Sequence, residues 1–292
     1  MDKVRKAIFP IAGLATRFLP ESKVVSKEMI PLAGRPFIDY TVKEAMASGI
    51  ENITFITRPK QKGVFEYFER DEKLEKILEE NKRDREVKIL KELSDVNKNI
   101  TFKSVLQKKP TGDASAIFLA RELIGEEPCA ICFSDDIVDS KVPCLKQLED
   151  IFMTCKRPVL ALKKMPEDRL PNYGVAKVEK IANRFYKIQG IKQKPKPGEE
   201  PSNLAVLGRM IITPDVFDYL KNSEEIKKKD GAIVPSLGEM AELGKAVYGY
   251  EIEGEWLECG DIPSWYKSFV KMALADPEYG DKLRAFLKTL KI

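Results

Sequence analysis

The stretch KAIFPIAGLATRFLPESKVVSKEMI, residues 6–30, decides the expected fold. It opens with an apolar run, 7–12, that is short enough for a buried strand. Gly13 then ends the strand, and a loop of small residues leads to Arg17 and, further on, Lys27. Backbone N–H groups in such a loop can hold phosphate oxygens while the cations neutralise their charge. On spacing alone, an ordinary turn with a charged surface is an equal alternative.

Strands and helices alternate through the first half of the chain. Apolar runs predict strands at 6–12, 52–58, 100–107 and 129–133, and helical periodicity predicts helices at 36–49, 62–69, 72–97 and 114–124. This order is typical of an α/β protein with a doubly wound, mostly parallel (Rossmann-like) sheet. Ligands of such sheets bind beyond the carboxyl ends of the strands, where the candidate motifs at 13–17, 107–112 and 134–136 fall.

The second half predicts an antiparallel or mixed extension of that sheet, followed by C-terminal helices. The expected strands are 159–163, 174–177, 185–191, 204–212 and 245–252, and the expected helices are 214–221 and 234–242. Residues 263–292 look like two helices broken at Asp276-Pro277. We therefore expect one domain, 1–262, with a helical tail, 263–292, packed on it.

Charge and cysteine content exclude several classes of protein. Fifty Lys and Arg residues against 46 Asp and Glu are nearly balanced, which indicates no nucleic-acid or membrane surface. No apolar stretch approaches the roughly 20 residues that a membrane-spanning helix needs. Cys129 and Cys132 have C-x-x-C spacing, but a strand would place them on opposite faces. We expect all five cysteines to be reduced thiols in a cytoplasmic protein.

The chain has no histidine, which excludes histidine general bases, catalytic triads and histidine metal sites. Metal-assisted phosphoryl or nucleotidyl transfer remains, because positioning and charge neutralisation carry most of its catalysis. Asp135 and Asp136 end an apolar strand, and side chains of neighbouring residues point to opposite sides there. One of them is expected to address a ligand, Mg²⁺ in a phosphate site. A carboxylate that caps the next turn is the alternative.

These motifs together resemble those of the sugar-1-phosphate nucleotidyltransferases. The usual signature G-x-G-T-R reads Gly13-Leu14-Ala15-Thr16-Arg17 here, and a lysine motif follows at Lys27. The likeness continues through LQKKPTG, SDDIVDSKVPCLKQL, NYGVAKVE, KPKPGEEPSNLAVLGR and LECGD, and the bacterial uridylyltransferases that act on glucose 1-phosphate fit best. Ala15 replaces the second glycine, and its methyl would crowd the triphosphate and add strain if φ is positive.

The resemblance implies a role for each matching residue. The nucleotide would lie on the loop and on an amide–glycine pair, the sugar phosphate on a second group, and the metal on two carboxylates. The nucleotide-binding residues would be Ala12, Gly13, Leu14, Ala15, Thr16, Gln107 and Gly112, the sugar-phosphate-binding residues Tyr173, Gly174, Gln193 and Lys194, the catalytic residues Arg17, Lys27 and Lys194, and the Mg²⁺ ligands Asp135 and Glu258.

Several of these positions depart from the family pattern. Gln193 stands where the family has glutamate, and Glu258 stands where it has a metal-binding aspartate, with Asp261 in reserve. An acidic D-E-I segment reads Gly231-Ala232-Ile233, and L-G-H-A reads Asp113-Ala114-Ser115-Ala116.

The implied reaction makes UDP-glucose and pyrophosphate from UTP and glucose 1-phosphate, by Mg²⁺-assisted in-line attack on the α-phosphate in a homo-oligomer, a dimer or tetramer. The departures keep two alternatives open. One is a non-catalytic regulatory paralogue, and the other is a sibling transferase that uses dTTP or another sugar 1-phosphate.

Overall fold

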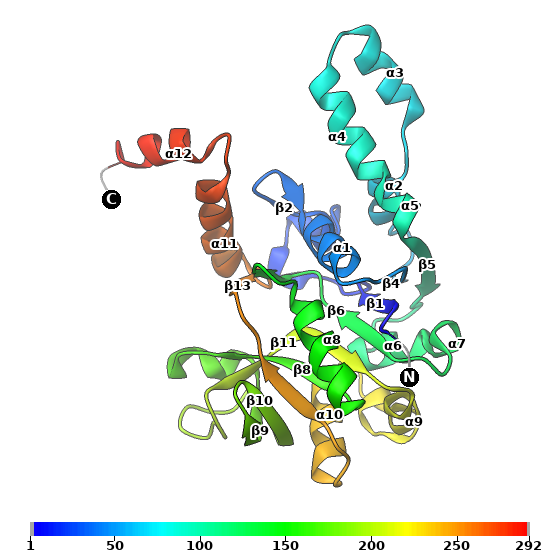
Figure 1. Ribbon diagram of the computed structural model, residues 1–292, viewed down its shortest axis with the longest axis vertical. Helices are drawn as coiled ribbons and strands as arrows, with labels where there is room; N and C mark the ends of the chain where they lie inside the picture. Colours follow the sequence, from blue (N-terminus) through cyan, green and yellow to red (C-terminus); the bar gives the residue numbers. More distant parts are fainter. Residues whose placement is uncertain (1–2, 291–292) are drawn as a thin grey trace.

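A computed structural model of the chain describes residues 3–290. Its centre is a nine-stranded mixed sheet in the order β5-β4-β1-β6-β11-β8-β12-β10-β9 (Figure 1). Four neighbouring strands run parallel to one another: β5 (Thr101–Leu106), β4 (Asn52–Thr57), β1 (Lys6–Pro10) and β6 (Cys129–Cys132). The predicted α/β class with a mostly parallel first half is confirmed.

The direction of winding reverses at β1. From β1 the chain builds outward through β4 and β5 on one side, then returns to place β6 on the other side. Open α/β sheets bind ligands at such a reversal, outside the carboxyl ends of the strands. Gly13 follows β1 and Ser134 follows β6, so the topology brings the loop after β1 next to the acidic end of β6.

The rest of the sheet is the predicted mixed extension. β11 (Leu204–Ile212) runs antiparallel to β6 and to β8 (Val159–Lys164), whereas β12 (Tyr248–Glu251) runs parallel to β8. The outer strands β10 (Phe185–Gln193) and β9 (Gly174–Ala182) form an antiparallel hairpin. Both extend beyond the predicted apolar runs, because backbone pairing continues where the side chains are already exposed.

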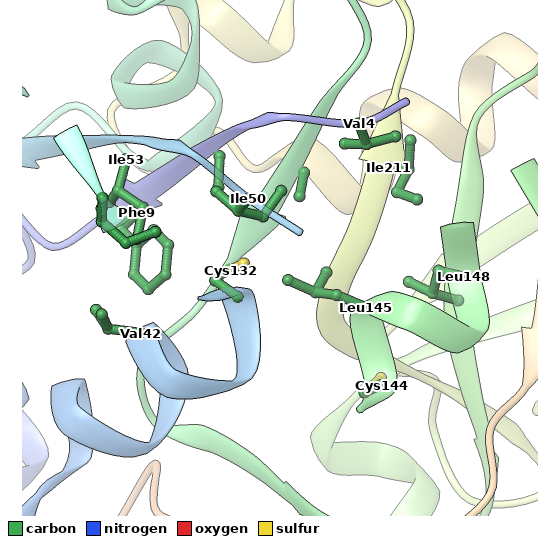
Figure 2. Packing of buried hydrophobic residues seen from close by; sticks show 14 of the residues in the cluster. Val4, Phe9, Val42, Ile50, Ile53, Cys132, Cys144, Leu145, Leu148 and Ile211 are labelled. Atoms are coloured by element: carbon green, nitrogen blue, oxygen red, sulfur yellow. The ribbon is translucent and has the colours of Figure 1, made fainter. Parts of the chain in front are cut away.

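Helices cover both faces of the sheet. One core contains side chains of α1 (Phe37–Ala47) and α8 (Cys144–Cys155), and Figure 2 shows part of it. The other contains side chains of α6 (Asp113–Leu119), α9 (Pro214–Asn222) and α10 (Ile233–Glu242).

The alternation along β6 shows how its residues are divided between these two cores. Ala130 and Cys132 belong to the first core, and Cys129 and Ile131 belong to the second. The two cysteines therefore face opposite sides, as predicted.

The charged segment 72–97 is not the single helix that its periodicity predicts. It folds into α3 (Glu72–Glu80), α4 (Asp84–Ser94) and the short α5 (Val96–Asn99), after α2 (Gly63–Phe68). Lys82 has φ of 57°, which reverses the chain between α3 and α4. The resulting hairpin projects from the body of the molecule (Figure 1), so the expected exposed excursion is present. The helix predicted at 114–124 likewise divides into α6 and α7 (Arg121–Ile124).

Two small sheets were not predicted. β7 (Asp136–Asp139) pairs antiparallel with β13 (Glu255–Glu258), and β2 (Pro31–Leu32) pairs with β3 (Arg35–Pro36). In the first pair Glu258 lies opposite Asp136, which brings two acidic segments together. Short 3₁₀ turns complete the elements: η1 (Thr16–Phe18), η2 (Glu21–Lys23), η3 (Lys27–Met29), η4 (Glu167–Asn172) and η5 (Glu225–Lys227).

The C-terminal segment forms α11 (Ile262–Ala275) and α12 (Gly280–Leu287), with the predicted break between them. α11 packs on the body, since Trp265 Nε1 donates to the Pro31 carbonyl oxygen at 2.9 Å and its ring joins a cluster with Phe18. None of the helices described in residues 3–290 has the length and apolar character to cross a membrane.

Candidate active site

The loop after β1, residues 12–16, leaves the sheet at the point of reversal. Ala12 is buried, whereas most of the loop beyond it is exposed. Ala15 has φ of 51° and ψ of 42°, the left-handed conformation that disfavours a side chain. The family glycine at this position would adopt it without strain, so the alanine keeps the loop conformation at a conformational cost.

Lys27, on η3, forms an ion pair with Asp135, at the end of β6. The Lys27 Nζ lies 2.9 Å from Asp135 Oδ2, and each side chain is about a fifth exposed, at 22% and 20%. Burial acts to lower the pKa of Lys27, but the carboxylates of Asp135 and Glu28 outweigh it and raise this pKa. Burial acts to raise the pKa of Asp135, but Lys27 outweighs it and lowers that pKa. Both groups are therefore charged at neutral pH.

Glu28 lies buried beside Lys27, and sequence reasoning gave it no role. Burial raises the pKa of its carboxyl to about 7, although the positive charge of Lys27 opposes this shift. Gln61 Nε2 donates to Glu28 Oε2 at 3.1 Å and to the Ile11 carbonyl oxygen at 3.0 Å. Gln61 Oε1 accepts from the backbone N–H of Arg58 at 3.1 Å. One amide side chain therefore ties η3, the end of β1 and the loop after β4 together.

The neighbour of Asp135 has a different role in the fold. Asp136 Oδ2 accepts from the Gly208 N–H at 2.9 Å, and Oδ1 accepts from Trp256 Nε1 at 2.8 Å. Burial, and then the charge of Asp135, raise the pKa of Asp136 to about 6. Asp136 thus joins β7, β11 and β13, which leaves Asp135 as the carboxylate at this strand end that pairs with Lys27.

A buried ion pair also contacts the backbone at the end of β6. Arg209, on β11, is fully buried and donates through Nη1 to the Phe133 carbonyl oxygen at 2.6 Å. Its Nη2 lies 3.1 Å from Glu44 Oε2, on α1. Arg209 thus links the Phe133 carbonyl group to α1, and removal of either charge would leave the other buried without a partner.

Glu258, the second predicted metal ligand, is turned toward two other side chains. Tyr173 OH and Arg169 Nη2 both donate to its carboxylate, and burial followed by the bond to Glu258 raises the pKa of Tyr173. The strands still bring it near Asp135, since the Cys259 N–H donates to the Asp135 carbonyl oxygen at 2.8 Å. Asp261, the reserve candidate, caps α11 by accepting from the Ser264 N–H at 2.9 Å.

Seven of the fifteen predicted site residues line one cavity of about 560 Å³. It lies between the end of β6 and the hairpin of β9 and β10. Its predicted members are Arg17, Asp135, Tyr173, Gly174, Gln193, Lys194 and Glu258. Lys27 joins this group through its ion pair with Asp135, and Arg17 Nη1 donates to the Gly260 carbonyl oxygen at 3.2 Å.

The cavity wall around Gly174 is tightly packed. A Cβ at this position would lie 2.8 Å from Gln193 Oε1 and 2.9 Å from Val234 Cγ1, so any side chain there would collide with both. The Lys194 N–H donates to the Tyr173 carbonyl oxygen at 2.8 Å. Tyr173-Gly174 and Gln193-Lys194, distant in sequence, thus form one wall.

Gln107 and Gly112 form a second group, at the end of β5 and the start of α6. Gln107 is buried, and its Nε2 donates to the Gly112 carbonyl oxygen at 3.1 Å and to Ser115 Oγ at 3.0 Å. Gly112 has φ of 87°, and a Cβ there would lie 2.1 Å from the Gly231 carbonyl oxygen. Only glycine fits this crossing of two loops.

Comparisons with known proteins identify the family of the chain. The family described as Nucleotidyl transferase matches residues 6–274. A UTP–glucose-1-phosphate uridylyltransferase from Staphylococcus epidermidis is 36% identical over 292 residues, which is 100% of both chains. Its counterpart named UTP–glucose-1-phosphate uridylyltransferase 2, from Staphylococcus saprophyticus, is 37% identical over 297 residues, again 100% of both.

Solved structures show the same fold. A UTP-bound UGPase from Acinetobacter baumannii superposes with a TM-score of 0.89 at 29% identity, covering 99% of this chain and 100% of the other. A UDP-glucose pyrophosphorylase complexed with UDP-glucose superposes with a TM-score of 0.84 at 30% identity, covering 94% and 100%. The family match and the full-length relatives show that this chain is an enzyme and belongs to the nucleotidyl transferase family.

Proposed function

We propose that the chain makes UDP-glucose and pyrophosphate from UTP and glucose 1-phosphate. The observation that carries this proposal is the cavity in which Arg17 and Asp135 meet Tyr173, Gly174, Gln193 and Lys194. One end of the site offers cations and exposed backbone to a triphosphate, and the other offers a lysine and an amide to a sugar phosphate. The relatives named above are, by their names, uridylyltransferases acting with UTP and glucose 1-phosphate.

The nucleotide base lies, in this proposal, against Gln107 and Gly112. The Gln107 amide nitrogen is already engaged, which directs its carbonyl oxygen Oε1 to accept the N–H of a uracil ring. Gly112 lets the ring approach the backbone. The triphosphate then follows the loop of residues 12–16 toward Arg17 and Lys27.

The acceptor phosphate lies near Lys194, with one of its oxygens directed in line at the α-phosphorus of UTP. That oxygen forms the new P–O bond as the bond to the β-phosphate oxygen breaks, and pyrophosphate leaves. The acceptor is already an anion at neutral pH, so no protein base is required. Arg17 and Lys27 stabilise the charge that develops on the leaving group.

The residues at the end of β6 fit Mg²⁺. Asp135 offers an ionised carboxylate beside the cavity, and Mg²⁺ takes one or two carboxylates together with phosphate oxygens and waters. Glu258 is the second ligand in this proposal, once its carboxylate leaves Arg169 and Tyr173. Bound there, the ion would polarise the phosphates and neutralise part of their charge. Within residues 3–290 no cluster of three or more acidic or cysteine side chains forms a cage for a metal.

We further propose a cytoplasmic homo-oligomer, a dimer or tetramer, in which residues 1–262 form the catalytic domain and 263–292 form a tail packed on it. The packing of α11 against β2 and β13 supports a tail that lies on the rest of the chain.

Pyrophosphate release with Mg²⁺ over a panel of nucleotides and sugar 1-phosphates tests the proposed function. We expect the fastest release with UTP and glucose 1-phosphate. Preference for dTTP or another sugar would replace the substrate assignment, and no release with any pair would favour a regulatory paralogue.

A further inference from the structure

The cavity contains a carboxylate to which neither the family pattern nor the reaction gives a role. Asp113 is the first residue of α6, directly after Gly112, and it lines the same cavity as Gln193. It therefore lies where the segment proposed to bind the base meets the pocket proposed to hold the sugar.

One oxygen of Asp113 is anchored by the backbone. Its Oδ1 accepts from the Ile233 N–H at the start of α10, at 2.7 Å. The next residue, Val234, packs over Gly174 together with Gln193 Oε1. Asp113, Val234, Gly174 and Gln193 thus follow one another around a single wall of the cavity.

The hydrogen bond to the start of α10 uses only one of the two carboxylate oxygens of Asp113. Among the contacts found in residues 3–290, nothing donates to Oδ2, and no lysine or arginine forms an ion pair with Asp113. Burial, reinforced by the charge of Glu225, raises the pKa of Asp113 to about 6, so the group is still largely ionised at neutral pH. An uncharged asparagine or serine would cap the helix without placing an unpaired charge beside the cavity.

Asp113 also lies close to a segment in which the sequence departs from the family pattern. The acidic D-E-I segment of the family reads Gly231-Ala232-Ile233 here, and Ala232 lines the same cavity. Asp113 bonds to the residue directly after Ala232. This part of the cavity therefore has a carboxylate from α6, whereas Ala232 in the loop before α10 offers none.

We propose that Asp113 determines acceptor specificity: its free carboxylate oxygen accepts a hydrogen bond from a hydroxyl of the sugar ring. This inference rests on the proposed function, because it takes the cavity to hold a sugar 1-phosphate. A carboxylate at this place favours neutral hexose 1-phosphates and repels hexuronic acid 1-phosphates. A bond from a hydroxyl to a charged acceptor is stronger than the same bond to an amide.

The test combines one isosteric variant with acceptors that each lack one hydroxyl. Asp113→Asn keeps an oxygen for the Ile233 N–H but removes the charge. Glu225→Gln is the matched control, since Glu225 Oε2 accepts from the neighbouring Ala232 N–H at 3.1 Å and Glu225 does not line the cavity. Parent and variants are assayed with glucose 1-phosphate, its 2-, 3-, 4- and 6-deoxy analogues, and glucuronate 1-phosphate.

We expect the parent to lose roughly tenfold in kcat/KM when one particular hydroxyl is removed, and Asp113→Asn to lose much less for the same removal. KM for UTP should be unchanged, and relative use of glucuronate 1-phosphate should rise in Asp113→Asn alone. If every deoxy analogue affects the parent and Asp113→Asn equally, Asp113 only caps α10 and the inference is wrong. If the parent uses no sugar 1-phosphate, the proposed function fails and the inference fails with it.

Discussion

Lys27 Nζ lies 2.9 Å from Asp135 Oδ2, so the predicted phosphate-binding lysine and the predicted metal-binding aspartate neutralise each other across the end of the sheet. Each is thereby held in its charged form before a substrate arrives. In the proposed reaction, each charge would exchange its partner for an opposite charge on the bound triphosphate or cation.

We predict that Asp135→Asn lowers turnover by roughly 10²–10³-fold, the usual effect of removing one preorganised electrostatic contact. Pyrophosphate release at saturating Mg²⁺ measures it, with thermal unfolding recorded alongside. Asp139→Asn is the control, because Asp139 is exposed at the other end of β7. If Asp135→Asn had nearly the turnover of the parent, Asp135 would not be a metal ligand.

Arg17→Ala should separate activity from stability. Arg17 is exposed and its guanidinium reaches the Gly260 carbonyl oxygen across the cavity, so folding depends on it little. We expect the free energy of unfolding to change by less than about 0.5 kcal/mol, and turnover to fall more than tenfold. Arg83→Ala, in the exposed helical hairpin, should alter neither. An equal loss of stability and activity in Arg17→Ala would indicate a structural role.

Ala15→Gly should improve the nucleotide loop. A left-handed conformation costs a non-glycine residue roughly 1–2 kcal/mol, and glycine costs about 0.4–1 kcal/mol through the unfolded chain. The net gain in stability is therefore small, but removal of the methyl should also lower KM for UTP. Ala33→Gly is the matched control, since Ala33 has φ of 47° in the turn between β2 and β3. Ala33→Gly should gain similar stability, with KM for UTP unchanged. If KM for UTP in Ala15→Gly equals that of the parent, the methyl group of Ala15 does not crowd the nucleotide.

The sequence was sufficient for the parallel half of the sheet because apolar strands alternate with helices there. It was insufficient for β7 and β13, which are four residues each and pair across more than a hundred residues of chain. The turn at Lys82 also has no glycine or proline to mark it, so 72–97 gave the pattern of one helix.

For the site, motifs predicted roles for Asp135, Arg17 and Lys27 but could not show which groups would pair. The bonds of Asp136 to Gly208 and Trp256 depend on tertiary packing. The same holds for the approach of Asp113 to the cavity wall of Gly174 and Gln193, although its place directly after Gly112 was a signal that could have identified it.

Glu28→Gln should change how stability depends on pH. The pKa of Glu28 is about 7 in the folded chain against an ordinary 4.5, so the folded state keeps a proton that the unfolded state releases. The free energy of unfolding therefore falls as pH rises from 4.5 to 7, by up to about 3 kcal/mol from this group. Glutamine does not titrate, so the variant should match the parent below this window and exceed it above pH 7. Chemical denaturation at several pH values measures the difference. Glu21→Gln, at an exposed position, is the control. If the free energy of unfolding depended on pH in the same way in Glu28→Gln and the parent, the raised pKa of Glu28 would be contradicted.

Gln193→Glu tests the sugar itself. The side chain lies over Gly174 at the edge of the cavity, and glutamate has the same shape. An ionised acceptor makes stronger bonds to hydroxyls, by about 1 kcal/mol, so kcat/KM for glucose 1-phosphate should rise about fivefold. Asp113 places another carboxylate in the same cavity, and the mutual repulsion should make this gain larger in an Asp113→Asn background.

Kinetics with glucose, galactose, N-acetylglucosamine and glucuronate 1-phosphates compare the two proteins. Glutamine can donate a hydrogen bond and glutamate cannot, so a native sugar that presents an acetamido carbonyl or a carboxylate would be used less well by Gln193→Glu. If Gln193→Glu has a lower kcat/KM than the parent with glucose 1-phosphate, the proposal is wrong in one of two ways. Either glucose 1-phosphate is not the acceptor, or Gln193 does not contact the sugar.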